Sequence, residues 1–261
     1  AAVSGNVKVW NRENMLTNFQ ALEYNTSQNL DRRAYDIINT ITVVPGAVWA
    51  WRREIILELG WFSKDTLAED SDMTLSLLRS GYSVHHEEYA YAYTEAPSNW
   101  NAFAKQRFRW AFWLLQVTWK HIDAIFSSET PLMLQFFIFP SFIIFQIIIP
   151  IIAPLFDIFT LGLLTINILS YVLYGSSIYM ETLVHILLYS WIFLLFDFII
   201  ACIALTFEKD ESWKLIRYFI PQRFSYRFFM YYINLKSLWN ALKWVAIWWN
   251  KLERSGTVKS K

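Results

Sequence analysis

The distribution of apolar and polar positions divides the chain near Thr130-Pro131. Before this point apolar runs are short and charged residues are frequent, whereas after it uncharged runs are long. Short runs that alternate with charges are typical of a folded α/β domain, and uncharged runs of about 20 residues are typical of membrane spans. The pattern therefore predicts a mixed α/β part followed by an α-helical membrane part.

Local composition predicts the elements of the first part. Short β-branched or Tyr-rich runs bounded by turn residues indicate strands at Val3–Val9, Thr40–Val44 and Val84–Thr94. Helical patterns cover Asn14–Asp31, Asp70–Ser80 and Asn99–His121. In the last of these, Arg and Lys interleave with Trp, which is typical of a helix at a membrane surface. A soluble helix with an aromatic core face is the alternative.

The second part offers four candidate spans. Leu132–Phe156 and Leu183–Phe207 are strong, Ile158–Met180 is weaker, and Phe228–Trp249 carries Lys236 and Lys243 on one face. Four spans would place the loop with Lys209 outside and the basic tail inside. Two spans, formed by the strong segments alone, would keep every Lys and Arg inside. Length favours four spans and charge favours two; we expect four.

Composition excludes some functions and indicates that the chain is a fragment. Of 261 residues 55% are hydrophobic, and the net charge of +1 offers no basic surface for nucleic acid. The lone cysteine, Cys202, cannot form an intrachain disulfide and is expected to be a small apolar side chain. The chain opens within an apparent strand, without Met or a signal peptide. We therefore expect a C-terminal part of a longer protein.

Two short segments carry the candidate chemistry. Ala68-Glu69-Asp70-Ser71-Asp72 precedes a predicted helix, where carboxylates remain ionised, although Asp70 or Ser71 could simply cap that helix. About 35 residues later comes Gln106-Arg107-Phe108-Arg109-Trp110. Arg109 offers a charged fork for phosphate and Trp110 a flat face for a sugar ring. A membrane-surface helix with Arg at the lipid headgroups is the alternative.

Three other groups suggest sites that we rank lower. Asp70-Ser71-Asp72 matches the Asp-x-Asp pattern of a metal motif, but the family resemblance given below implies an acceptor-side base at this position. His85-His86-Glu87-Glu88 is expected to lie on a strand, where neighbours point to opposite faces and chelate poorly. Asp197 and His185 could form a proton path, but packing between helices is the favoured interpretation. We therefore predict no metal site in this chain.

Taken together, the segments resemble family 2 processive glycosyltransferases, which include cellulose, chitin, hyaluronan and poly-N-acetylglucosamine synthases. The likeness rests on Glu69-Asp70, followed by Gln-x-x-Arg-Trp and then membrane spans. It continues through Val44-Pro45-Gly46-Ala47-Val48, Thr94-Glu95-Ala96-Pro97 and Trp249-Asn250-Lys251-Leu252-Glu253-Arg254-Ser255-Gly256. These segments look most like the poly-β-1,6-N-acetylglucosamine synthase branch.

The resemblance implies a fold and roles for residues. Residues 1–98 would form the acceptor half of a GT-A-type α/β domain, 99–130 an interface helix region with the Gln-x-x-Arg-Trp motif, 131–250 the transmembrane helices and 251–261 a basic cytoplasmic tail. Asp70 would be the catalytic base, positioned by Glu69. Substrate would be bound by Gln106, Arg109, Trp110, Pro45 and Gly46.

The resemblance also implies an activity and its partners. The complete enzyme would transfer a sugar, with inversion, from a UDP-sugar to a growing polysaccharide at the plasma or inner membrane. It would use Mg²⁺ or Mn²⁺ at an Asp-x-Asp site outside this chain, so the chain alone would be inactive. A transporter or pore subunit explains the spans but not the two motifs; a non-catalytic remnant is the third hypothesis.

Overall fold

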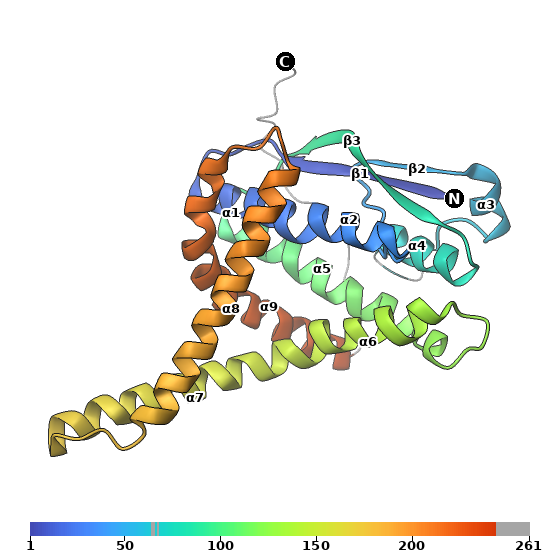
Figure 1. Cartoon of the computed structure of the whole chain (residues 1–261). Coiled ribbons are helices and arrows are strands. Elements are labelled where there is room, and N and C mark those ends of the chain that lie inside the picture. The colour runs from blue at the N-terminus through green and yellow to red at the C-terminus, as the bar shows by residue number, and fades with distance from the viewer. Residues whose placement is uncertain (64–65, 67, 244–261) are drawn as a thin grey trace.

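A computed structural model describes residues 1–63, 66 and 68–243. The predicted tail 251–261, the segment Trp249–Gly256 and the end of the Phe228–Trp249 candidate span lie outside the described residues. The described part of the chain is mixed α/β, with a small sheet and a majority of helices, as predicted in outline. Figure 1 shows the sheet as one layer, helices beneath it, and a long helical hairpin that extends away from both.

The sheet has three strands in the order β2-β1-β3: β1 (Ala2–Val9), β2 (Trp49–Trp51) and β3 (Val84–Thr94). β1 runs parallel to β3, from Ala2 opposite Val84 to Val9 opposite Thr94, and antiparallel to β2. The register shifts between Gly5 and Asn6. A Cβ on Gly5 would lie 2.5 Å from a methyl group of Val48 and 2.6 Å from the carbonyl oxygen of Ala90, so this crossing requires glycine.

Helices cover the sheet and form the core with it. α1 (Met15–Glu23) begins with a capping box between Asn14 and Thr17, and continues through the π-helix η1 (Tyr24–Asn29) into α2 (Leu30–Ile37). α3 (Arg53–Glu58) and α4 (Glu69–Arg79) follow β2, and α5 (Trp100–Lys120) begins at the cap Asn99. Leu75, Leu77 and Leu78 of α4 are buried with Val84 and Val117. The predicted helices thus exist, with α1, η1 and α2 in place of one helix.

The strand predicted at Thr40–Val44 is wrong. The carbonyl oxygen of Thr42 accepts a hydrogen bond from Ser71 Oγ at 3.2 Å, and the amide of Val44 donates to Thr74 Oγ1 at 3.2 Å. The backbone of this segment is therefore bonded to side chains of α4, and β2 pairs with β1 instead. β-branched composition identified an extended segment but not its bonding partner.

The first predicted span, Leu132–Phe156, is not a single helix across a membrane. The 3-10 helix η2 (Ile122–Ile125) precedes this run. The run itself is divided among the π-helix η3 (Leu134–Ile138), α6 (Phe139–Phe142), the π-helix η4 (Ile143–Ile148) and the start of α7. Pro140 and Pro150 lack the amide that a regular helix needs, which accounts for irregular turns nearby. Leu134, Ile138 and Phe139 are buried in the α/β core. The start of this apolar run therefore packs against protein on one side, while side chains such as Phe136 and Phe145 are exposed.

Two described helices are long and apolar enough to cross a membrane, α7 (Ile149–Tyr174) and α8 (Met180–Phe207). Gly175, in the left-handed conformation at φ 70°, ends α7 and allows the turn into α8. Most side chains of both helices are exposed and apolar. The weaker candidate Ile158–Met180 therefore overlaps the later part of α7, and the strong candidate Leu183–Phe207 lies within α8.

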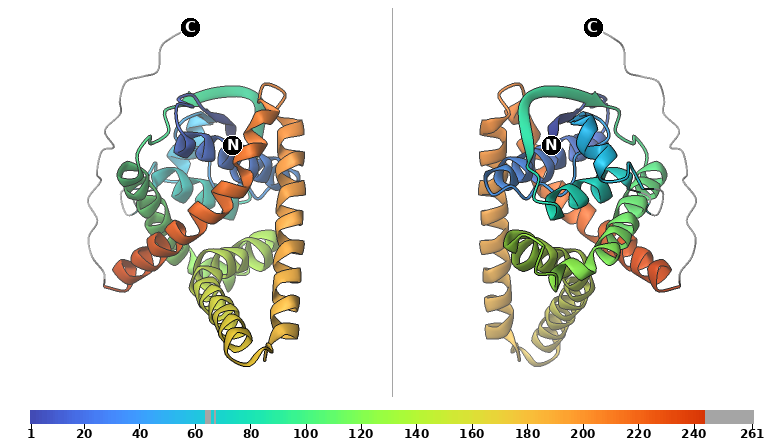
Figure 2. Two further views of the ribbon diagram at one scale, coloured as in Figure 1. Left: turned by 90° about the vertical axis from the view of Figure 1, so that its left-hand side faces the viewer. Right: turned by 90° about the vertical axis from the view of Figure 1, so that its right-hand side faces the viewer.

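The chain returns from the hairpin to the α/β part (Figure 2). After α8, Glu208 pairs with Lys8 at 3.3 Å and with Arg33 at 3.0 Å, and Glu211 pairs with Arg12 at 2.5 Å. Ala201 and Leu205 of α8 join the same core as Val7 and Val9. The loop that contains Lys209 therefore lies on the side of the α/β part, which contradicts the expected four-span arrangement.

The last described elements are the 3-10 helix η5 (Trp213–Tyr218) and α9 (Phe219–Leu242). α9 lies along α5: the rings of Phe103 and Phe229 stack with centroids 5.4 Å apart. Its arginines pair with both hairpin helices, Arg227 with Asp157 at 2.5 Å and Arg223 with Asp197 at 3.3 Å. Asp197 thus faces protein, as expected from its sequence context. The predicted fourth span is a helix that packs on α5 over its described residues.

The docked loop predicts the side on which Lys209 is found. A cysteine placed at Lys209 should react with a membrane-impermeant maleimide from the same side as a cysteine at the exposed Asn101 of α5, because Glu208 and Glu211 hold the loop against the α/β part. A cysteine at Ser176, in the turn between α7 and α8, is the control for the opposite side. Labelling of positions 209 and 176 from one side and 101 from the other would contradict the hairpin.

Candidate functional site

A cavity of about 650 Å³ lies beneath the sheet, between η1, α2, the segment 41–47, the start of α4, α5 and α6. The residues that the sequence singled out come from three separate places in the chain, and all of them line this cavity: Pro45, Gly46, Glu69, Asp70, Gln106, Arg109 and Trp110. The fold therefore brings the two sequence motifs and the Pro-Gly turn to one cavity.

Asp70 is held by two backbone amides. Its Oδ2 accepts a hydrogen bond from the amide of Gly46 at 3.2 Å, and its Oδ1 accepts one from the amide of Ser71 at 2.8 Å. The cap position of α4 is Ala68, whose side chain makes no capping bond, and Asp70 is the second residue of the helix. Asp70 is therefore not the N-cap, and its carboxylate is fixed between α4 and the Pro45-Gly46 turn.

The surroundings of Asp70 raise its pKa. Burial has the largest effect, the Ser71 amide opposes it, and the negative charge of Glu69 raises the pKa further. A carboxylate with a raised pKa is a stronger base than an exposed one. The site thus combines a fixed carboxylate with an environment that favours proton uptake.

Asp72, the other carboxylate of the Asp-Ser-Asp sequence, has a structural role. It is buried and accepts hydrogen bonds from Lys120 Nζ and His121 Nε2, each at 2.8 Å. Burial raises the pKa of Asp72, but the bonds from His121 and Lys120 outweigh this effect and hold it below its ordinary value. Asp72 therefore ties α4 to the end of α5 and does not share a ligand set with Asp70.

The described residues do not fit a divalent cation. Among them, no three His, Cys, Asp or Glu side chains are grouped so that they could hold an ion. His85 contacts Asp36 at 2.9 Å, whereas His86 contacts the Ser4 carbonyl at 3.2 Å, so the two neighbours point in different directions. His185 contacts the Glu181 carbonyl oxygen within its own helix.

The motif on α5 divides between the cavity and the core. Gln106 and Trp110 line the cavity, and Oε1 of Gln106 is buried without a hydrogen-bond partner. Arg107, which lies between them, points elsewhere: it pairs with Glu23 at 2.6 Å, and its guanidinium lies 4.4 Å from the ring centroid of Trp110. Arg107 therefore covers one face of Trp110 and leaves at most the other face for a ligand.

The sequence did not identify the wall formed by η1 and α2. It contributes Tyr24, Gln28, Asp31, Arg32 and Tyr35 to the cavity. Burial raises the pKa of Asp31 to about 6 and lowers that of Arg32 to about 10. The sequence pattern predicts only a helix in this region. It does not predict the π-helix η1, a feature that often marks a functional site.

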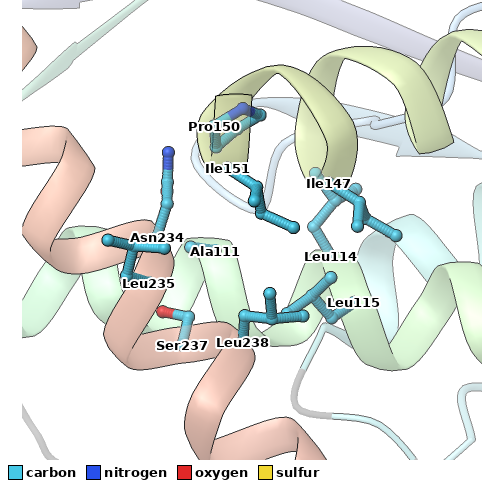
Figure 3. Close-up of a pocket in the computed structure, with 10 residues that line it drawn as sticks. All are labelled: Ala111, Leu114, Leu115, Ile147, Pro150, Ile151, Asn234, Leu235, Ser237 and Leu238. Carbon is cyan, nitrogen blue, oxygen red and sulfur yellow. The ribbon is translucent and has the colours of Figure 1, made fainter. Parts of the chain in front are cut away.

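A second, smaller pocket holds little space. Its volume is about 20 Å³, and Figure 3 shows its lining of mainly apolar side chains from α5, η4, α7 and α9. This is about the space of a single water molecule. It reflects imperfect packing of three helices, and Leu114 also lines the large cavity.

Comparisons with known proteins give the family context. A family model described as "Glycosyl transferase family group 2" matches residues 1–249. The chain is 24% identical over 110 residues to a poly-beta-1,6-N-acetyl-D-glucosamine synthase of Staphylococcus aureus (strain COL), covering 42% of this chain and 27% of that protein. It is 31% identical over 108 residues to the probable glycosyltransferase YdaM of Bacillus subtilis (strain 168), covering 40% and 26%. These alignments span about a quarter of each relative.

The contact between Arg107 and Glu23 generates a prediction on stability. Arg107→Ala should destabilise the protein by roughly 3 kcal/mol, because it leaves Glu23 without its partner and removes support from Trp110. Lys105→Ala, at an exposed position on the same helix, should change stability by less than about 0.5 kcal/mol. Chemical denaturation in detergent measures both. Equal effects of the two variants would show that the ion pair contributes nothing measurable.

Proposed function

The chain belongs to glycosyl transferase family group 2, and from this premise we propose that it is the acceptor-side and membrane part of a processive polysaccharide synthase. The observation that carries the proposal is the single cavity lined by Glu69-Asp70, Gln106, Arg109 and Trp110. A held carboxylate, a cation and aromatic faces in one cavity suit the transfer of a sugar to a sugar hydroxyl.

In the proposed reaction, the hydroxyl oxygen of the acceptor attacks the anomeric carbon of the donor sugar. The new carbon–oxygen bond forms as the bond from that carbon to the nucleoside diphosphate breaks, which inverts the anomeric configuration. Asp70 accepts the hydroxyl proton, and the nucleoside diphosphate departs with the bonding electrons. The hydrogen bonds from Gly46 and Ser71 hold the carboxylate in place during this transfer.

The other cavity residues have supporting roles in this proposal. Arg109 stabilises negative charge that develops on the diphosphate. Trp110 stacks on the terminal acceptor sugar with the face that Arg107 leaves open. Gln106 offers its unpaired Oε1 to a sugar hydroxyl, and the Pro45-Gly46 turn brings backbone close to the acceptor.

We propose that the donor is a UDP-sugar, which the complete enzyme would bind with Mg²⁺ or Mn²⁺ at an Asp-x-Asp site outside this chain. The described cavity lies beside the helices that lead into the α7–α8 hairpin, so we propose that the product is made at the membrane with the α/β part in the cytoplasm. The chain alone is proposed to be inactive; polymer synthesis by purified residues 1–261 would contradict this.

Asp70→Asn tests the assignment of the base. In the complete enzyme it should lower the rate of polymer formation about 10²–10⁴-fold, because the amide cannot accept the proton. Nucleotide affinity should be unchanged. Asp36→Asn makes the same chemical change at a carboxylate outside the cavity, where Asp36 contacts His85, and should leave the rate unaltered. Synthesis near the wild-type rate by Asp70→Asn would remove Asp70 as the base.

Glu69→Gln tests the electrostatic link between the two carboxylates. The charge of Glu69 raises the pKa of Asp70, so its removal should lower that pKa. Since Asp70 acts when ionised, the acid limb of the kcat/KM profile should move to lower pH in the variant. Glu54→Gln, at an exposed position on α3, should leave the profile in place. A shift of the acid limb to higher pH in Glu69→Gln would contradict the coupling.

A further inference from the structure

Arg32 lies on the wall of the cavity formed by η1 and α2 and has no role in the mechanism above. Arg32 is 9% exposed, and its Nη1 is buried without a hydrogen-bond partner. It lines the cavity and lies close enough to Asp31 and Asp70 for their charges to affect it. A buried donor without a partner costs free energy, so a ligand that accepts its hydrogen bond would remove that cost.

The next residue of the same helix shows the contrast. Arg33 does not line the cavity, and its guanidinium pairs with Glu88 and with Glu208. Arg33 is thus occupied in holding the fold together. Of two successive arginines on α2, one is tied to protein carboxylates, whereas the other lines the cavity and has a buried Nη1 without a hydrogen-bond partner.

Charge decides which ligand suits Arg32. Three carboxylates line the cavity (Asp31, Glu69 and Asp70) against two guanidinium groups (Arg32 and Arg109), which is a formal net charge of 2 − 3 = −1. At Arg32, the carboxylates of Asp31 and Asp70 would repel a diphosphate, which in the reaction proposed above lies at Arg109, whereas they would not repel an uncharged ligand. The second unpaired buried group of the cavity, Gln106 Oε1, is an acceptor, so the ligand must offer both donors and acceptors.

We propose that Arg32 is a substrate-binding residue that donates hydrogen bonds to hydroxyl or acetamido oxygens of the uncharged acceptor sugar chain. The aromatic rings of Tyr24 and Tyr35 beside it add apolar surface suited to sugar rings. The proposal rests on the function proposed above, and places an acceptor contact on α2, across the cavity from the α5 motif.

Binding measurements on the protein in detergent test this assignment. The probe is a β-1,6-linked N-acetylglucosamine tetrasaccharide, and pyrophosphate is the comparison ligand. Arg32→Met should weaken tetrasaccharide binding about tenfold or more, the loss expected for a hydrogen bond to a charged group, and should leave pyrophosphate binding unchanged. Arg33→Met is the matched control: it should lower the melting temperature and leave the tetrasaccharide affinity unchanged.

Each other outcome overturns the inference. Unchanged tetrasaccharide affinity in Arg32→Met removes Arg32 from the acceptor site, and loss of pyrophosphate binding alone makes it a phosphate ligand. If Arg32→Met does not fold, Arg32→Lys, which keeps the charge but loses the planar fork, should fold and bind the tetrasaccharide more weakly; failure of both to fold makes Arg32 structural. If the wild-type protein binds no tetrasaccharide, the proposed function is overturned as well. Near-wild-type synthesis by Asp70→Asn would overturn the assignment of the base without affecting the assignment of Arg32, so the two failures can be distinguished.

Discussion

The arrangement of the whole molecule depends on one buried carboxylate, that of Glu208. It pairs with Lys8 of β1 and Arg33 of α2, and accepts a hydrogen bond from Asn6 at 3.2 Å. Removing these charges from water is costly, so the cluster adds little net stability, but a misplaced loop would leave charges buried alone. Glu208 therefore selects the one arrangement in which α8 returns to the sheet, and this in turn sets the start of η5 and the course of α9 along α5.

The sequence predicted elements well where a local pattern decides the structure. Val84–Thr94 has the predicted bounds, and α4 and α5 begin and end within one residue of expectation. The sequence-based prediction failed where equally apolar segments lie in different environments, because contacts with residues distant in the sequence decide which environment each segment has. Leu134, Ile138 and Phe139 are as apolar as the exposed residues of α8, yet they lie in the protein core, and composition alone cannot distinguish these two environments.

The candidate site shows the same division. Asp70, Gln106 and Trp110 could be singled out because their spacing resembles a known motif, and the fold gathers them at one cavity. Arg107 belongs to the same motif by position, but its partner Glu23 is 84 residues away along the chain. The sequence did not identify Arg32 as a site residue, because a polar residue in a helical pattern is ordinarily exposed to solvent. Its burial at the cavity depends on the π-helix η1 and on the packing of α2, which the sequence pattern does not reveal.

The two ion pairs of α9 have a mechanical consequence. Arg227 and Arg223 attach α9 to α7 and α8, while stacked rings attach it to the helix that carries the Gln-x-x-Arg-Trp motif. A hairpin in a bilayer tilts when the thickness of the hydrocarbon layer changes. In the membrane placement proposed above, α9 contacts both hairpin helices and α5, so such a tilt would transmit strain to the cavity wall and make the geometry around Trp110 depend on the lipid composition.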